Sequence, residues 1–319
     1  MYKYILSRIL ISIPTLIGVS ILIFFFMRIL PGDVIDAMVT DETGALVFTD
    51  EQRESIEESL GLNRPLHTQY LGWMKDVITG DLGYSFWTKV SVGEHVRRRA
   101  PMTLEIAVLA LIISWIIGLP VGILAAIHRN SIRDYISRGM VILFLAIPSF
   151  YAALAFLIFV VLFFTWRPPI EVIFFWEHPI KSLYVALPAA IAIGTGMAAV
   201  VARMARSSIL EVIREDYVRT AKSKGLSQKV IINRHVLKNA IIPVVTISGL
   251  QFGNLLSGAI AVEVALSIPG LGALLAQGLA DRDWMIIQNL VLIFAFLFIL
   301  INLIVDIIYS LIDPRIRYD

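Results

Sequence analysis

Long apolar stretches separated by shorter polar segments dominate the chain. An α-helix needs about 20 mostly apolar residues to cross the hydrocarbon core of a membrane. Six windows meet this length, and they are 9–30, 104–127, 139–165, 183–202, 240–262 and 286–312. Prolines lie inside several of them, including Pro14, Pro120, Pro148 and Pro188, and the neighbouring helices of a bundle can satisfy the backbone groups that a proline frees. The pattern predicts an all-α integral membrane protein with six transmembrane helices.

Composition supports this prediction. The mean hydropathy is +0.80, with 58% apolar and 16% charged residues, whereas soluble chains have about 45–50% apolar and about 25% charged residues. The net charge of +2 gives no sign of a nucleic-acid partner. The chain has no cysteine, which excludes disulfides, thiolate metal sites and cysteine nucleophiles.

Lysine and arginine set the predicted orientation, because they are enriched in cytoplasmic loops close to membrane ends. With the N-terminus inside, the segment 203–239 alone carries nine basic residues, and the short outer loops carry only Arg167, Lys181 and Arg282. The cluster Arg97–Arg99 lies on the outer side, but long loops translocate largely regardless of charge. We therefore expect both the N- and C-termini to be cytoplasmic.

The segment 31–103 is long enough to form a helical cap on the periplasmic side. Thr49 and Gln52 have capping-box spacing and Gly61 can end the helix that they begin. A second short helix is expected to end near Gly80. The cap either shields the bundle or docks another molecule. It separates residues 1–30, the N-terminal segment with the first transmembrane helix, from a five-helix core over 104–319.

The loop 203–242 is unusually long and charged for a connection between two spans. Its apolar residues Ile209, Val212, Ile213 and Tyr217 follow a helical spacing, Gly225 breaks the helix, and Ser227 can cap a second one. Composition favours an amphipathic helix held on anionic lipid. The helix–break–helix outline favours a knob that inserts into a partner protein.

Several short motifs together carry a family resemblance over nearly the whole chain. They are "LPGD" (30–33), "GLNRPLHTQYLGWMKDVITGDLGYS" (61–85), "AIPSF" (146–150), the segment 217–243, "IPGLG" (268–272) and "DPRIRY" (313–318). In this order they resemble permease subunits of bacterial type I ABC importers, specifically the first permease of the dipeptide/oligopeptide/nickel group, of the dipeptide-permease-B type.

The resemblance implies the type I ABC importer permease fold and a place in the bacterial inner (plasma) membrane. It also implies four kinds of partner: a second homologous permease, two P-loop ATPase subunits that bind ATP and Mg, a periplasmic substrate-binding protein, and membrane lipid. This chain itself is expected to bind no cofactor.

In the resembled family a cytoplasmic coupling loop with the pattern E-A-A-x-x-x-G docks on the ATPase. Aligning Gly225 with that glycine places Arg219, Thr220 and Ala221 on E-A-A. The family's glutamate is thus an arginine here, which would pair with an acidic residue of the ATPase, and the expected nearby proline appears only at Pro243. The resemblance implies ATPase coupling for Asp216, Tyr217, Arg219, Thr220, Ala221, Lys222, Lys224, Gly225, Leu226 and Ser227.

Catalytic motifs are absent from the sequence. The patterns G-x-x-x-x-G-K-[ST], H-E-x-x-H and G-x-S-x-G do not occur. The five histidines lie outside the centres of the predicted spans. We therefore expect no catalytic residue and no metal ligand, so this chain is not expected to be an enzyme and movement must be powered by another subunit.

Polar and small residues in the predicted spans are candidates for the transport pathway. Gln251, Asn254 and Ser257 share one face of the fifth span and either line a pathway or bond neighbouring helices. Gly194 and Met197 allow close approach of substrate or of another helix.

The outer segment 263–284 is expected to hold either a gate helix or a re-entrant packing element. Its acidic residues Glu263, Asp281 and Asp283 are candidates for contact with a binding protein.

Two functions compete. The first is a permease that forms half of a pathway for di- or oligopeptides by alternating access, with nickel or oligosaccharide as alternative substrates. The second is an ion-coupled secondary transporter, a class that often has inverted repeats and intramembrane ionisable residues. No convincing repeat relates 1–138 to 183–319, and the span centres are nearly free of charge. The sequence therefore favours the importer permease.

Overall fold

The computed structural model describes residues 2–29, 58, 62–165 and 173–312, and helices dominate these ranges. The helices in chain order are α1 (Tyr2–Ile29), α4 (Leu66–Thr79), α5 (Val92–Ile127), α6 (Ile132–Ala146), α7 (Ser149–Phe164), α8 (Pro179–Val212), α9 (Asp216–Ser223), α10 (Gln228–Val230), the π-helix η1 (Ile231–Val236), α11 (Leu237–Ala265), α12 (Leu271–Ala280) and α13 (Trp284–Ile312). The prediction of an all-α chain is confirmed for the described ranges.

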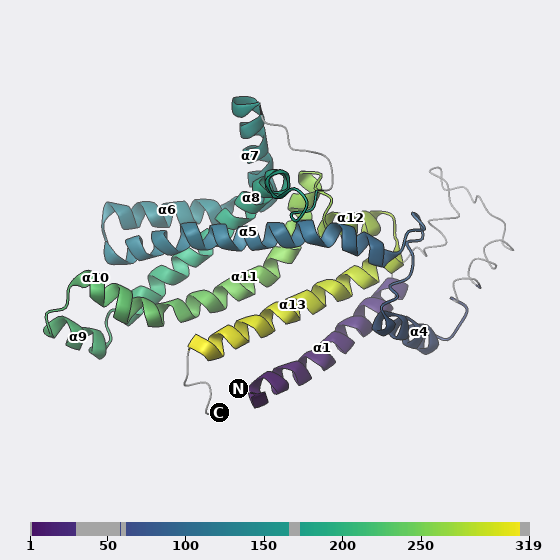
Figure 1. Cartoon of the computed structure of the whole chain (residues 1–319), viewed down its shortest axis with the longest axis horizontal. Coiled ribbons are helices and arrows are strands. Elements are labelled where there is room, and N and C mark those ends of the chain that lie inside the picture. The colour runs from purple at the N-terminus through teal and green to yellow at the C-terminus, as the bar shows by residue number, and fades with distance from the viewer. Residues whose placement is uncertain (1, 30–57, 59–61, 166–172, 313–319) are drawn as a thin grey trace.

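The long helices α1, α5, α8, α11 and α13 run along the long axis of the molecule (Figure 1). Each is part of a segment that is long and apolar enough to cross a membrane, and α6 with α7 supplies a sixth span if the two count as one. The start of α1, the end of α13 and the short helices α9 and α10 lie toward one end, which is the predicted cytoplasmic end. The short helices α4 and α12 lie toward the other.

The third predicted span, 139–165, is not one straight helix. It comprises the end of α6 and all of α7, which meet at an angle of 100°. Pro148 explains the break, because proline has no backbone N–H and disfavours helical geometry at the residue before it. Ile147 accordingly adopts an extended conformation. By contrast, Pro14, Pro120 and Pro188 stay inside continuous helices.

The most extensive helix contact among the described residues joins α5 to α8. Gly118 and Gly122 on α5 let its backbone approach the carbonyl oxygens of Ala198 and Ala202. Small residues at this spacing are the usual means of close helix packing in membranes. The contact fixes α5 and α8 as the centre of the fold.

Adding a methyl group at Gly122 is expected to destabilise this contact. A Cβ there would lie 2.6 Å from the Ala202 carbonyl oxygen and 2.7 Å from the Ala205 Cβ. We expect Gly122→Ala to lower the free energy of unfolding in detergent micelles by about 1–3 kcal/mol. Gly139→Ala on α6 is the control, since a Cβ there meets nothing within 4 Å. Equal stability of the two variants would contradict this packing.

At the outer end, α4 is held against the bundle by aromatic contacts. Trp73 stacks on Phe24 of α1 at 6.1 Å between ring centroids, and its indole N–H donates to Asn289 of α13 at 3.1 Å. The helix ends at Gly80 as predicted, with φ +87°. The first predicted cap helix, with Thr49, Gln52 and Gly61, lies outside the described residues.

The boundary between the cap and the core differs from the prediction. Residues 92–103 were expected in the cap, but they form the first three turns of α5 and continue directly into its span. The three arginines at 97–99 therefore stand on a transmembrane helix that extends beyond the predicted window.

Candidate functional site

The predicted coupling segment forms a compact structure at the cytoplasmic end. The apolar spacing predicted one helix through Ile209 and Tyr217, but α8 ends at Val212 and α9 begins at Asp216. Glu215 between them is extended and occupies the N-cap position of α9. Acidic residues at a helix N-terminus interact favourably with its dipole, so Glu215 and Asp216 favour a new helix at this point.

The inner face of α9 packs against three membrane helices. Val218 and Ala221 are buried, and they join a cluster whose other buried members are Ala126 of α5, Ile209 of α8, Ile231 and Val236 of η1, and Ala240 of α11. Ala221, one of the residues expected to couple to the ATPase, thus faces the bundle and not the outer surface of α9. Its small side chain instead holds α9 against the bundle.

A second attachment runs through Tyr217. Its hydroxyl donates to the carbonyl oxygen of His235 at 3.3 Å and accepts from the Asn239 amide at 2.8 Å. Tyr217 therefore ties α9 to the helical stretch that begins at α10 and continues through η1 into α11.

Gly225 ends α9, as predicted. Its φ is +75°, a conformation that favours glycine. The backbone N–H of Gly225 donates to Lys222 and that of Leu226 to Ala221, the pair of bonds that defines a Schellman motif. Ser227 occupies the N-cap position of α10, although its side chain makes no cap hydrogen bond.

The outer face of this segment is exposed. All residues from Lys222 to Val230 are exposed, together with Asp216, Tyr217, Arg219 and Thr220. Arg219 pairs with Asp216 at 3.2 Å, but both side chains are largely open to solvent, so the pair contributes little to stability. The segment thus presents Arg219, Lys222 and Lys224 outward on a rigidly held helix.

The structure corrects two of the predicted pathway residues. Gly194 lies against the Ala110 carbonyl oxygen, where a Cβ would approach to 2.9 Å, and Met197 is 4% exposed within the main core cluster. Both contribute to packing inside this chain. Gln251 is half-buried on α11 and stays a prediction. The side chains of Asn254 and Ser257 lie outside the described residues.

Two of the three predicted binding-protein contacts are buried. Glu263 is fully buried and accepts hydrogen bonds from the Thr103 hydroxyl at 2.7 Å and from the Ala273 backbone at 3.0 Å. Asp283 accepts from the Ser85 hydroxyl at 2.6 Å and from the backbone of Phe86 at 2.9 Å. Both carboxylates hold the outer end together and offer no surface to a partner, whereas Asp281 is partly exposed.

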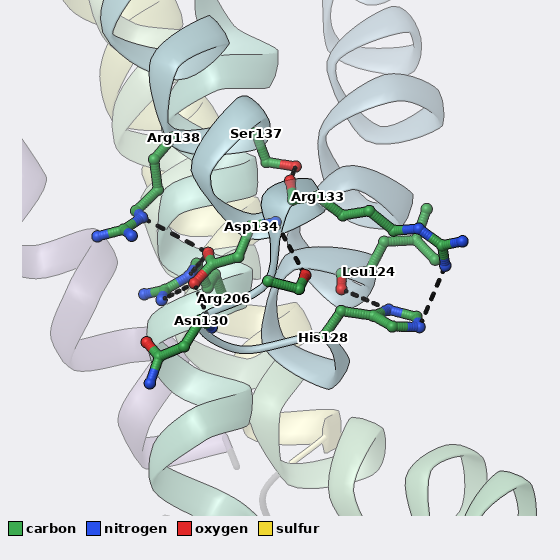
Figure 2. A network of polar contacts seen from close by, with 9 residues as sticks. Leu124, His128, Asn130, Arg133, Asp134, Ser137, Arg138 and Arg206 are labelled. Carbon is green, nitrogen blue, oxygen red and sulfur yellow. Dashed lines mark hydrogen bonds and ion pairs between the residues drawn. The ribbon is translucent and has the colours of Figure 1, made fainter.

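Sequence reasoning missed one polar network, which lies close to the cytoplasmic end and is shown in Figure 2. Asp134 of α6 is fully buried and receives two hydrogen bonds from Arg206 of α8, at 2.7 and 2.9 Å. The backbone N–H of Asn130 donates to it at 3.0 Å, and Arg138 lies 3.6 Å away. Ser131, three residues before Asp134, is the N-cap of α6 and is a capping signal that the sequence offers, but nothing near it indicates that Arg206 is the pairing partner.

Comparison with known proteins places the chain in a family. The model of the binding-protein-dependent transport system inner membrane component matches residues 118–318, and the model of its N-terminal part matches residues 1–107. The dipeptide transport system permease protein DppB of Alkalihalophilus pseudofirmus is 39% identical, with full coverage of both chains. The glutathione transport system permease protein GsiC of Salmonella choleraesuis is 38% identical, also with full coverage of both.

Solved structures confirm the fold. The methionine ABC transporter MetNI in an inward-facing conformation superposes with a TM-score of 0.56 and 19% identity, covering 69% of this chain and 96% of that one. An amino acid ABC transporter gives a TM-score of 0.53 at 16% identity, covering 68% and 94%. The chain therefore belongs to the binding-protein-dependent transport system inner membrane components, the permease subunits of ABC importers, and is a multi-pass protein of the bacterial inner membrane.

Proposed function

We propose that this chain forms half of a translocation pathway for di- or oligopeptides, which a second homologous permease completes. The full-length relatives named above are permeases for dipeptides and for glutathione, which is itself a small peptide. This supports peptide over nickel or oligosaccharide as the substrate class. Transport would proceed by alternating access, with a periplasmic substrate-binding protein delivering the peptide.

The energy would come from two P-loop ATPase subunits that bind ATP and Mg, since this chain is proposed to bind no cofactor and to catalyse no reaction. The observation that carries the coupling role is the two-sided structure of α9. Val218 and Ala221 fasten the helix to the bundle, while Arg219, Lys222 and Lys224 remain exposed. A partner that binds the exposed face would move α5, α8 and α11 through the buried face.

Charge reversal on the exposed face tests this proposal. We expect the double substitution Arg219→Glu and Lys222→Glu to reduce peptide uptake by about tenfold or more. The proposed partner of these basic residues is an acidic surface of the ATPase, and two glutamates would be repelled by it, which weakens docking by more than the roughly 1.4 kcal/mol that tenfold represents. Uptake and ATP hydrolysis would be measured with the complete importer in proteoliposomes. Hydrolysis without matching uptake is the expected signature of lost coupling.

The matched control is Arg214→Glu, an exposed arginine of the same loop that precedes α9. Normal uptake by the double variant, in a complex that is normally assembled, would contradict the coupling role. A complementary measurement is chemical crosslinking from Lys222 and Lys224. Recovery of crosslinks to lipid only would assign the exposed face to the membrane surface.

A further inference from the structure

A cavity of about 300 Å³ opens between α5, α6 and α8 beside the Asp134 network. Its floor and wall are apolar and include Val121, Ala125, Val141 and Ala202. Three arginines, Arg138, Arg203 and Arg206, also line it. It therefore joins an apolar surface to a strongly basic one within a single cavity.

The positive charge of this cavity is only partly compensated. No acidic residue is among those that line it in the described part of the chain. The neighbouring Asp134 accepts two bonds from Arg206, which does line the cavity, and its carboxylate also accepts the bond from the Asn130 backbone. Arg138 contacts Asp134 only at 3.6 Å, and its guanidinium lies over the ring of Tyr135 at 4.5 Å. Arg203 is exposed and makes no ion pair within the described part of the chain. The three arginines and one aspartate leave an excess of two positive charges.

The surroundings indicate which kind of anion fits. Two of its lining residues, Arg138 and Arg206, lie close to the turn between α5 and α6 (Figure 2), which places the cavity on the cytoplasmic half of the spans. Toward the middle of the membrane it borders an exposed apolar face of α6, where Ile142 is 67% exposed and Leu143 is 51% exposed. A soluble anion would use the arginines alone, whereas a lipid would use both the arginines and the apolar face.

We propose that this cavity binds an anionic phospholipid of the cytoplasmic leaflet, with the phosphate at Arg138 and Arg203 and an acyl chain along Val141 and Ile142. Basic pockets between transmembrane helices on the cytoplasmic side are suited to anionic headgroups. Arginine is suited to phosphate because its planar donors can bind two oxygens at once. This site is separate from the coupling segment and does not depend on the transported substrate.

Native mass spectrometry of the purified chain with added phosphatidylglycerol or phosphatidylcholine tests the site. We expect the wild-type chain to retain phosphatidylglycerol in preference to phosphatidylcholine. Each of Arg138→Gln and Arg203→Gln should weaken retention about fivefold, and the double variant about 25-fold, because one arginine near an anionic lipid surface contributes about fivefold in affinity. Arg206 is left unchanged, since it holds Asp134.

The matched control is Arg133→Gln, an exposed arginine of the same helix that contacts His128 and does not line the cavity. Unchanged retention of phosphatidylglycerol in the double variant would overturn the proposal. So would equal losses in the double variant and in Arg133→Gln. Displacement of the lipid by inorganic phosphate or by a dipeptide would overturn it in favour of a soluble anion. Thermal unfolding of each variant without added lipid checks that folding is unaltered.

Discussion

Replacement of Asp134 by alanine is expected to destabilise the protein by about 3–5 kcal/mol, the cost of removing one partner from a buried ion pair. Asp134 is fully buried, and its loss leaves Arg206 without its two short hydrogen bonds. The arginine side chain keeps 23% exposure, so the effect should fall toward the lower end of that range. The turn before α6 also loses the bond from the Asn130 backbone.

The measurement is equilibrium unfolding in detergent micelles, with Arg133→Ala as the control on the same helix. Arg133 is exposed, and replacing it should change the stability by less than about 0.5 kcal/mol. A double-mutant cycle with Arg206→Ala then isolates the interaction between the two side chains. A coupling energy near zero would show that the pair does not join α6 to α8.

Replacement of Glu263 by alanine is expected to destabilise the protein by about 2–4 kcal/mol, because one buried and one half-buried donor lose their acceptor. The donors are the Thr103 hydroxyl on α5 and the Ala273 backbone on α12. Thr103 in turn accepts from the Leu271 backbone at 2.8 Å, so one buried carboxylate fixes the start of α12 to two long helices. We therefore expect α12 to loosen in this variant.

Because the chain has no cysteine, one introduced thiol can report on α12 alone. Leu275→Cys places it at a position that is 7% exposed, and maleimide labelling should be slow in the parent and faster after Glu263→Ala. Asp281→Ala removes a partly exposed carboxylate nearby and serves as the control. Equal labelling rates in both variants would contradict the role of Glu263.

Glycine-to-alanine substitutions test the contact between Glu263 and α12 independently. A Cβ at Gly270 would overlap the Glu263 carboxylate, whereas a Cβ at Gly258 meets nothing within 4 Å. We expect Gly270→Ala, but not Gly258→Ala, to reproduce the faster labelling of α12. The second glycine of the "IPGLG" segment has a similar physical reason, because a Cβ at Gly272 would lie 2.7 Å from the Ile260 Cα.

Much of the helical architecture could be predicted from hydropathy, because a membrane span must satisfy its backbone within one helix. Five predicted windows lie in long helices, and Gly80 and Gly225 end helices where their conformational freedom suggested. The break at Pro148 could not be predicted, since five other prolines, at positions 14, 101, 120, 188 and 243, stay inside helices. Whether a proline bends a span depends on neighbouring helices, which a single sequence does not specify.

The sites were harder to predict than the helices. Glu263 lies in the last turn of α11 and Asp283 directly precedes α13, positions that suit either a surface or a buried anchor. Their partners Thr103 and Ser85 lie far away in the sequence, so burial could be recognised only in the fold. Gly194, Met197 and Ala221 likewise carry no local sign of which side of a helix is covered.

The attachment of α9 has a mechanical consequence. Val218 and Ala221 join one apolar cluster with residues of α5, α8, η1 and α11, so α9 is in direct contact with the helices that it would move. From α10 through η1 to the end of α11, the helix Gln228–Ala265 is about 55 Å long at 1.5 Å per residue, and a tilt of one degree at its inner end displaces the outer end by about 1 Å. Glu263, which holds α12, lies near the outer end of this helix. A small rotation at the inner surface is thereby converted into an ångström-scale displacement at the opposite face of the membrane.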